Sequence, residues 1–119
     1  MSTQNLYQLN YYVPEKNHEE LKQRLFSAGA GKLNNYDQCC WQILGGGQFR
    51  PLKNSKPTSG KLNQLQKLKE YKVEMICQEQ YLQTVLENLL KYHPYEQPAY
   101  HIVKIVNTRL HKKNKLQDK

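Results

Sequence analysis

The sequence predicts one α+β domain in which two halves, each made of a strand, a helix and a strand, share an antiparallel sheet. Apolar and polar residues alternate near the start of the chain and again after residue 70, as they do in half-buried strands. Each of these stretches is followed by apolar residues at the spacing of an amphipathic helix. A length of 119 residues fits a single domain and leaves no room for a second core.

The first half starts with a strand over residues 6–13, where every second residue falls on one side. Those residues are Tyr7, Leu9, Tyr11 and Val13. Pro14 closes the strand, and Asn17 with Glu20 then has the spacing of a capping box at the start of a helix. The helical stripe consists of Leu21, Leu25 and Ala28. Gly29 or Gly31 can adopt the left-handed conformation that ends this helix.

A second strand is predicted over residues 38–43, because Cys39, Trp41 and Ile43 alternate with more polar neighbours. We expect it to end at the glycines 45–47, which favour a bend or bulge. The interval 48–69 carries two prolines and few apolar residues, so it is interpreted as a strand fragment around Phe49 and then a long loop. Loops of that length usually bind something or cover a neighbour.

The second half repeats the first. Val73, Met75 and Cys77 share one face of a strand, and a strongly amphipathic helix follows. Its apolar stripe consists of Leu82, Val85, Leu86, Leu89 and Leu90. Two prolines end this helix, and "AYHIVKIV" follows as a strand with apolar residues on both faces. Such a strand is either central in its sheet or covered by another subunit.

This order of elements predicts the ferredoxin-like βαββαβ arrangement. Right-handed crossovers then place both helices on one face of an antiparallel sheet. The other face carries Trp, Tyr and Ile side chains, and it therefore needs a cover, either another chain or a ligand such as RNA bases.

Composition limits the location and the partners of the protein. The net charge is +8, but residues 109–119 hold five basic residues against one acidic residue, so the rest is only mildly basic. We expect a domain over residues 1–107 and a flexible basic tail over 108–119, which could attract nucleic acid or an acidic protein. Three cysteines that cannot all pair, with no preceding apolar signal segment, favour a reduced cytoplasmic location. No apolar run is long enough to cross a membrane.

The segment "KYHPYEQPAY" gathers an imidazole, a carboxylate and three phenols around two prolines. The prolines can simply make the connection rigid while Tyr95 and Tyr100 pack against the sheet. Alternatively, His93 and Glu96 belong to a small polar site for a metal ion, a small molecule or a partner group. Two ligands at this spacing do not by themselves close a metal site.

The segment "NYDQCCW" also has two interpretations, since cysteine is commonly a small buried apolar residue. Cys39 and Cys40 project to opposite strand faces, so only one of them could join His93 at a metal ion. The glycines lack the context of a phosphate-binding loop. Arg50 beside Phe49 suits a carboxylate or phosphate group, although a surface ion pair is the commoner role. No catalytic constellation is visible.

Four motifs occur in order along the chain: "YYVP", "SAGAGKLNNYDQC", "GGGQFRPL" and "HPYEQPAY". They resemble the domain inserted in the YqfO-type dinuclear-metal hexameric protein family, which also has short free-standing homologues. The turn from His93 to Glu96 is more distantly similar to that of CutA, the divalent-cation tolerance protein. This resemblance implies the PII-like version of the ferredoxin fold and a homotrimer whose sheets face inward. The two-metal centre and the GTP cyclohydrolase label of longer members belong to flanking segments that are absent here.

The resemblance implies a non-enzymatic, trimeric binding or regulatory module. Its clefts between subunits are expected to take a divalent metal ion, copper or zinc, or a small anionic ligand. The residues expected to bind the ligand are Tyr36, Asp37, Phe49, Arg50, Tyr95 and Tyr100, and those expected to bind the metal are Cys39, His93 and Glu96. The alternative is RNA or acidic-protein binding through the basic tail and the aromatic sheet. A third hypothesis is an enzyme whose site is shared between subunits.

Overall fold

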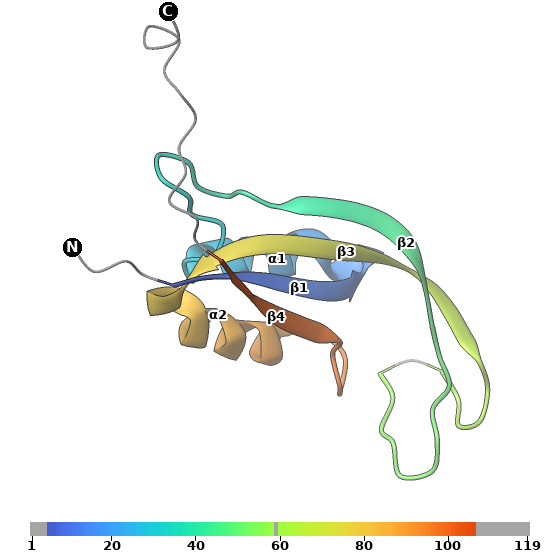
Figure 1. Ribbon diagram of the computed structural model, residues 1–119. Helices are drawn as coiled ribbons and strands as arrows, with labels where there is room; N and C mark the ends of the chain where they lie inside the picture. Colours follow the sequence, from blue (N-terminus) through green and yellow to red (C-terminus); the bar gives the residue numbers. More distant parts are fainter. Residues whose placement is uncertain (1–4, 59, 107–119) are drawn as a thin grey trace, which may run out of the picture.

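The computed structural model describes residues 5–58 and 60–106 and has a four-stranded antiparallel sheet with two helices (Figure 1). In chain order the elements are β1 (Leu6–Pro14), the short 3-10 helix η1 (Glu15–Asn17), α1 (His18–Ser27), β2 (Trp41–Phe49), β3 (Gln66–Gln78), α2 (Glu79–Tyr92) and β4 (Tyr100–Ile105). The strand order is β2-β3-β1-β4. The predicted α+β class and the ferredoxin-like βαββαβ order are confirmed. Neither described helix is long and apolar enough to span a bilayer.

Both helices lie on one face of the sheet, and the core is the layer of side chains between the helices and the sheet (Figure 1). The sheet side of the core consists of Leu9, Tyr11 and Val13 of β1 and Val73, Met75 and Cys77 of β3, all almost fully buried. The helix side consists of Leu21, Leu25, Val85 and Leu89. Burial of each such side chain stabilises the fold by roughly 1.5–3 kcal/mol. The predicted apolar faces of both central strands are therefore confirmed.

The start of α1 differs from the prediction. Asn17 makes no side-chain capping bond; it has helical backbone angles and ends η1, which leads directly into α1. The capping-box prediction is wrong because the chain is already helical before the expected cap. The end of α1 agrees with the prediction, since Gly29 and Gly31 have φ angles of +117° and +79°.

Both predicted ends of the second strand are also wrong, because β2 begins at Trp41, after Cys39 and Cys40, and does not stop at the glycines. β2 continues through Gly45, Gly46 and Gly47 to Phe49, and these glycines pair in register with Glu70, Lys69 and Leu68 of β3. None of the three has a positive φ, and β3 is 13 residues long, so it offers hydrogen-bond partners along the whole of β2. The predicted long loop is shortened accordingly to residues 50–65.

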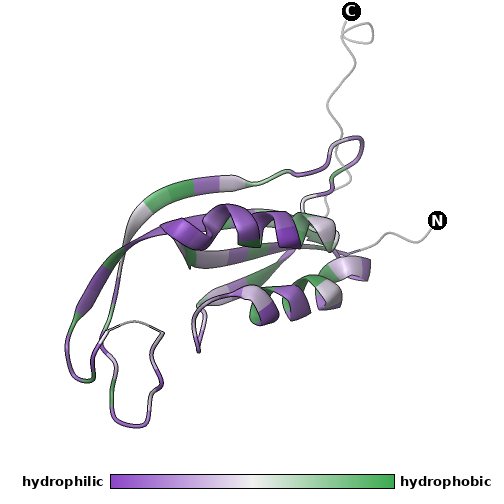
Figure 2. Cartoon of the chain, turned by 180° about the vertical axis from the view of Figure 1, so that it is seen from behind, coloured by the Kyte–Doolittle hydropathy of each residue, from purple (hydrophilic) through white to green (hydrophobic). Residues whose placement is uncertain are grey.

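β4 is an edge strand, paired only with β1 among the described elements. Its apolar residues on both faces are thus not explained by a central position. On the sheet face away from the helices, Trp41, Ile43 and Val103 are 57%, 50% and 52% exposed. Figure 2 shows the apolar part of β2 lying clear of both helices. Within the described chain this face has no cover, as the sequence predicted. The predicted basic tail, 108–119, lies outside the described residues.

A buried histidine joins β2 to the helix layer. His18, at the start of α1, is 2% exposed, and its Nε2 lies 2.8 Å from Oε1 of Gln42 in β2. Its ring stacks on Tyr71 of β3 at 3.9 Å. Burial lowers the pKa of His18, so the neutral imidazole is the form that donates Nε2–H to Gln42.

Candidate ligand groove at the end of the sheet

A groove of about 670 Å³ lies where the end of β2, the loop 50–58 and the turn 93–99 meet. Most of its lining is apolar or aromatic, which is the usual composition of a small-molecule site. Its aromatic and charged lining residues are Tyr12, Phe49, Arg50, Glu70, Tyr95 and Glu96.

The turn 93–99 is fixed by His93, the residue that caps α2. Its N–H donates to Leu89 O at 2.9 Å, and its ring lies 2.6 Å from Tyr12 O through Nε2. The backbone N–H of Tyr95 lies 3.1 Å from Nδ1. A backbone N–H can only donate, so Nδ1 is the acceptor and Nε2 carries the proton. Burial lowers the pKa of His93, in keeping with this neutral tautomer.

Tyr95 projects from that turn into the groove. Its hydroxyl donates to Oε2 of Glu70 at 2.9 Å, and its ring centroid lies 6.2 Å from that of Phe49. Burial, together with the hydrogen bond to the Glu70 carboxylate, raises the pKa of Tyr95. The Glu70 carboxylate lies over Gly47, where a Cβ would overlap with it. A side chain at position 47 would therefore require the Glu70 carboxylate, which accepts the hydrogen bond from Tyr95, to move.

The loop 50–58 is attached to the same turn by polar bonds. The N–H of Lys56 donates to both carboxylate oxygens of Glu96 at 3.2 Å, and the hydroxyl of Thr58 donates to Pro94 O at 2.6 Å. The acidic groups of the groove are thereby engaged within the chain. Arg50, in contrast, is exposed and forms no salt bridge with any residue in 5–58 or 60–106. It is the charged group free to meet a ligand.

The predicted site residues fall into two groups. Phe49, Arg50, Tyr95 and Glu96 line the groove, His93 supports it from behind, and Tyr100 follows the lining residue Ala99 at the start of β4. Tyr36, Asp37 and Cys39 lie instead in the segment before β2, at the other end of that strand. Eight residue steps along β2, at about 3.3 Å each, separate the two ends by roughly 26 Å. One chain therefore does not bring the groups together.

Tyr12 and Glu70 belong to the groove although the sequence did not point to them. Tyr12 sits in the strand whose apolar side faces the core, and Glu70 is one of several charged residues that alternate along β3. No local signal separates either residue from its neighbours, because their role depends on the turn 93–99 folding over the end of the sheet.

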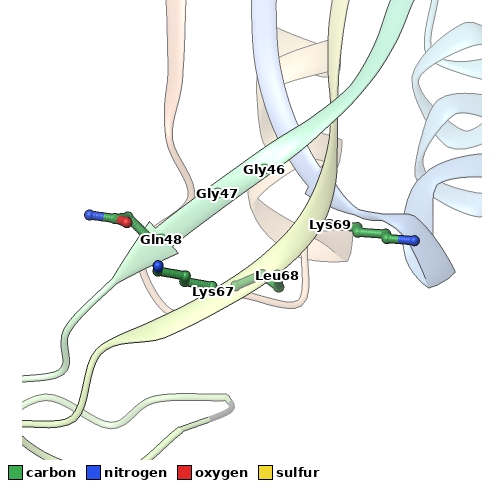
Figure 3. Close-up of a pocket in the computed structure, with 6 residues that line it drawn as sticks. All are labelled: Gly46, Gly47, Gln48, Lys67, Leu68 and Lys69. Atoms are coloured by element: carbon green, nitrogen blue, oxygen red, sulfur yellow. The ribbon is translucent and has the colours of Figure 1, made fainter.

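A second, shallower hollow of about 440 Å³ lies on the β2–β3 hairpin itself (Figure 3). Its lining consists of Gly46, Gly47, Gln48, Lys67, Leu68 and Lys69. In Figure 3, Gln48 and Lys67 extend to one side of the ribbon and Lys69 to the other, while the glycines present bare backbone. Gly46 and Gly47 border both hollows.

The three predicted metal ligands, Cys39, His93 and Glu96, do not form a metal site within the described residues of one chain. No group of three His, Cys, Asp or Glu side chains placed to hold a metal ion occurs in the part of the chain that the structure describes. Both ring nitrogens of His93 already have hydrogen-bond partners. Cys39 lies at the far end of β2 from Glu96. A site using all three predicted metal ligands would need more than one copy.

The fold and the groove define a class: ferredoxin-like α+β domains with one uncovered sheet face and a pocket at the end of the sheet. No family model matches the chain. It is 35% identical over 106 residues to the GTP cyclohydrolase 1 type 2 homolog of Halalkalibacterium halodurans, covering 89% of this chain and 28% of that protein. The corresponding Bacillus subtilis protein is 33% identical with the same coverage. The chain thus spans only about a quarter of the length of these relatives.

Solved structures agree with this similarity. The Bacillus cereus protein related to NIF3 matches with a TM-score of 0.77 and 27% identity, over 90% of this chain and 27% of that one. CutA from Synechococcus elongatus matches with a TM-score of 0.62 and 17% identity, over 89% of this chain and 81% of that one. The chain therefore has the CutA fold at nearly full length, and in sequence it is similar to one segment of the longer proteins.

Proposed function

We propose that this chain is a non-enzymatic binding or regulatory module of CutA/PII-like type, which assembles as a homotrimer and takes a small anionic ligand in the groove. The observation that carries the proposal is the groove itself: an aromatic wall of Phe49 and Tyr95 with the unpaired Arg50 at its rim. This wall suits an apolar or aromatic body, and the planar guanidinium suits a carboxylate or phosphate group.

The trimer is supported by the bare sheet face and by the separation of the predicted residues. An apolar sheet face is stabilised when another chain covers it. Only a neighbouring copy could also bring Tyr36, Asp37 or Cys39 to the groove of another, since about 26 Å of strand lies between them within one chain. The ligand site is then a cleft between subunits.

Native mass spectrometry of the purified full chain tests both parts, because it reports the number of subunits and any retained small molecule. Titration with anilinonaphthalene sulfonate, an aromatic anion, adds a defined probe. Arg50→Ala should weaken its binding about tenfold, the loss of roughly one charge-assisted hydrogen bond. Arg24→Ala on α1, remote from the groove, is the matched control and should bind like the natural chain. Equal affinity in both variants contradicts the groove proposal.

Divalent metal binding, with copper or zinc, is a second candidate. It is favoured by the solved neighbours that are called divalent ion tolerance proteins. The site would combine Glu96 and His93 of one copy with Cys39 of another, and His93 would have to give up one of its two hydrogen bonds. His93→Ala should therefore lower Cu²⁺ or Zn²⁺ uptake in a calorimetric titration, and unchanged uptake argues against the metal.

The nucleic-acid alternative uses the open face, where Trp41 is exposed and Lys72 is half-exposed, together with the basic tail. Removal of residues 108–119 should then abolish RNA binding and leave the groove intact, and moderate salt should have the same effect. A shared-site enzyme and a cytoplasmic location remain proposals. A GTP cyclohydrolase activity is not carried over from the relatives' name, because the chain matches only 28% of them.

A further inference from the structure

Positive charge in the described part of the molecule is concentrated on one segment. Residues 48–69, here called the arm, comprise the end of β2, the loop 50–65 and the start of β3. The arm has six basic residues and no acidic one, whereas the other described residues, 5–47 and 70–106, have seven basic and nine acidic side chains. The six are all exposed, and they are Arg50, Lys53, Lys56, Lys61, Lys67 and Lys69. Figure 1 shows the arm projecting beyond the ends of both helices, so a cationic segment extends from a slightly acidic body.

No carboxylate of the described residues forms a salt bridge with these cations. The four salt bridges within residues 5–58 and 60–106 lie in α1 and in the part of β3 after Glu70, and none includes the arm. Glu70 and Glu96, which lie beside the arm, accept hydrogen bonds from the Tyr95 hydroxyl and from the backbone N–H of Lys56. Cations that no carboxylate neutralises repel one another, and an anionic surface removes that repulsion.

Large apolar side chains are exposed among these cations. Leu52, Leu62 and Leu65 are 54%, 49% and 53% exposed. The N–H of Asn63 donates to Pro51 O at 2.6 Å, which holds the stretches that contain Leu52 and Leu62 side by side. A segment with both features suits the surface of a bilayer, because its cations meet lipid phosphates while its aliphatic side chains enter between the headgroups.

We infer that the arm is a docking surface for the anionic face of a phospholipid membrane, which the protein contacts without crossing. A single-stranded nucleic acid would also attract the cations, but its binding usually adds base stacking on exposed aromatic rings. Phe49 is the one aromatic residue of the arm, and it lies in the ligand groove near Tyr95. A second copy of the arm would bring the same charges and be repelled. The inference goes beyond the ligand groove and does not rest on it.

The first test measures binding of the full chain to vesicles made of equal parts of phosphatidylserine and phosphatidylcholine, by co-sedimentation. We expect the natural chain to bind, and failure to bind overturns the inference. Combining Lys53→Gln, Lys61→Gln and Lys67→Gln should weaken binding at least about fiftyfold, since each lysine at an anionic surface contributes about fivefold. Circular dichroism checks that the variant is folded.

The matched control removes the same charge from exposed positions outside the arm and keeps residues 108–119. It combines Lys16→Gln, Lys91→Gln and Lys104→Gln, and it should bind vesicles nearly as well as the natural chain. An equal loss in the two triple variants means that total charge or the basic tail causes binding, and this result also overturns the inference.

The second test separates a membrane from a nucleic acid. Leu62→Asn removes apolar contact without changing charge, so it should weaken vesicle binding about fivefold and leave binding to polyuridylate unchanged. Leu90→Asn at the end of α2, where the side chain is 53% exposed, is the matched control and should bind vesicles like the natural chain. If Leu62→Asn keeps full vesicle binding while the arm lysine variant loses polyuridylate binding, the arm is a nucleic-acid surface and the membrane is the wrong partner.

The ligand groove is tested separately, because all of these variants keep Arg50. Failure of the vesicle experiments refutes membrane docking and leaves the result of the Arg50→Ala titration unaffected. Failure of that titration refutes the groove and has no bearing on the arm.

Discussion

The two halves of the sheet differ in what surrounds them. β1 and the second half of β3 lie under both helices, and their inward side chains are almost fully buried. β2 has no comparable cover within the described residues, since Trp41, Ile43 and Leu44 are all exposed. Its side-chain hydrogen bonds to α1 are those of Gln42 with His18 and Lys22. The covered half is packed like the core of an independent domain, whereas β2 leaves large apolar side chains exposed within the described residues.

The glycines show the same contrast. In the covered half, Gly29 has a left-handed backbone and lies against the ring of Tyr81. In β2, Gly45 and Gly46 meet neither condition. Gly29 is thus explained by the backbone and the contacts of its own chain, whereas no described contact or backbone angle requires glycine at positions 45 and 46.

The largest expected effect is on the free energy of unfolding, when a leucine is truncated in the covered half and in β2. Leu89→Ala should lower the free energy of unfolding by about 2–5 kcal/mol, because it leaves a cavity in the core. Leu44→Ala in β2, where the side chain is 43% exposed, should cost well under half of that. Urea denaturation at one fixed protein concentration measures both, since association contributes to apparent stability. Similar losses would mean that β2 is part of the core.

The next largest effect is the difference in stability between alanine substitutions at Gly29 and at Gly46. Gly29→Ala combines a φ of +117° with a Cβ placed 2.5 Å from the ring of Tyr81, and we expect a loss of about 1–3 kcal/mol. Gly46→Ala should leave the stability of the unassembled chain unchanged or raise it by up to about 1 kcal/mol. Thermal unfolding at low concentration distinguishes the two. If Gly46→Ala destabilises the unassembled chain, then the fold of the chain itself requires glycine at this position, which contradicts the open space found there.

The smallest effect depends on pH. Burial lowers the pKa values of His18 and His93 below the ordinary value of 6.5. Below pH 6.5 the unfolded chain therefore binds more protons than the folded one, so stability is complete above this pH and is lost as the pH falls toward the lowered values. Each histidine contributes a slope of at most about 1.4 kcal/mol per pH unit. His93→Gln should cost about 1 kcal/mol at pH 7 and reduce that slope, and an unchanged slope between pH 7 and 5 would contradict the neutral buried imidazole.

Much of the fold could be predicted because its signals are local. Alternation at Leu9, Tyr11 and Val13 and the helical stripe around Val85 and Leu89 depend only on which face is buried. The ends of elements were harder. Glycines 45–47 favour a bend in isolation, but the length of β3 keeps them in the strand, and this partner is remote in sequence. Asn17 failed as a cap because η1 precedes it.

The candidate site was predictable only in part, for a similar reason. Phe49, Arg50, Tyr95 and Glu96 stand in two motifs, and the structure brings those motifs together. Tyr12 and Glu70 join them through contacts across the sheet that no local pattern reveals. The hydrogen bond of His93 Nε2 likewise depends on Tyr12 O, 81 residues away. Composition therefore indicates which residue types occur at the site, and topology decides which of them meet.

The uncharged character of β2 also affects how the chain behaves while it folds. Nine uncharged residues along an open edge offer N–H and C=O groups to any extended peptide nearby. During synthesis and refolding, folding therefore competes with fibrous aggregation at this edge, and crowding of newly made chains favours aggregation. A lysine introduced into β2 should therefore improve the recovery of dispersed protein after refolding.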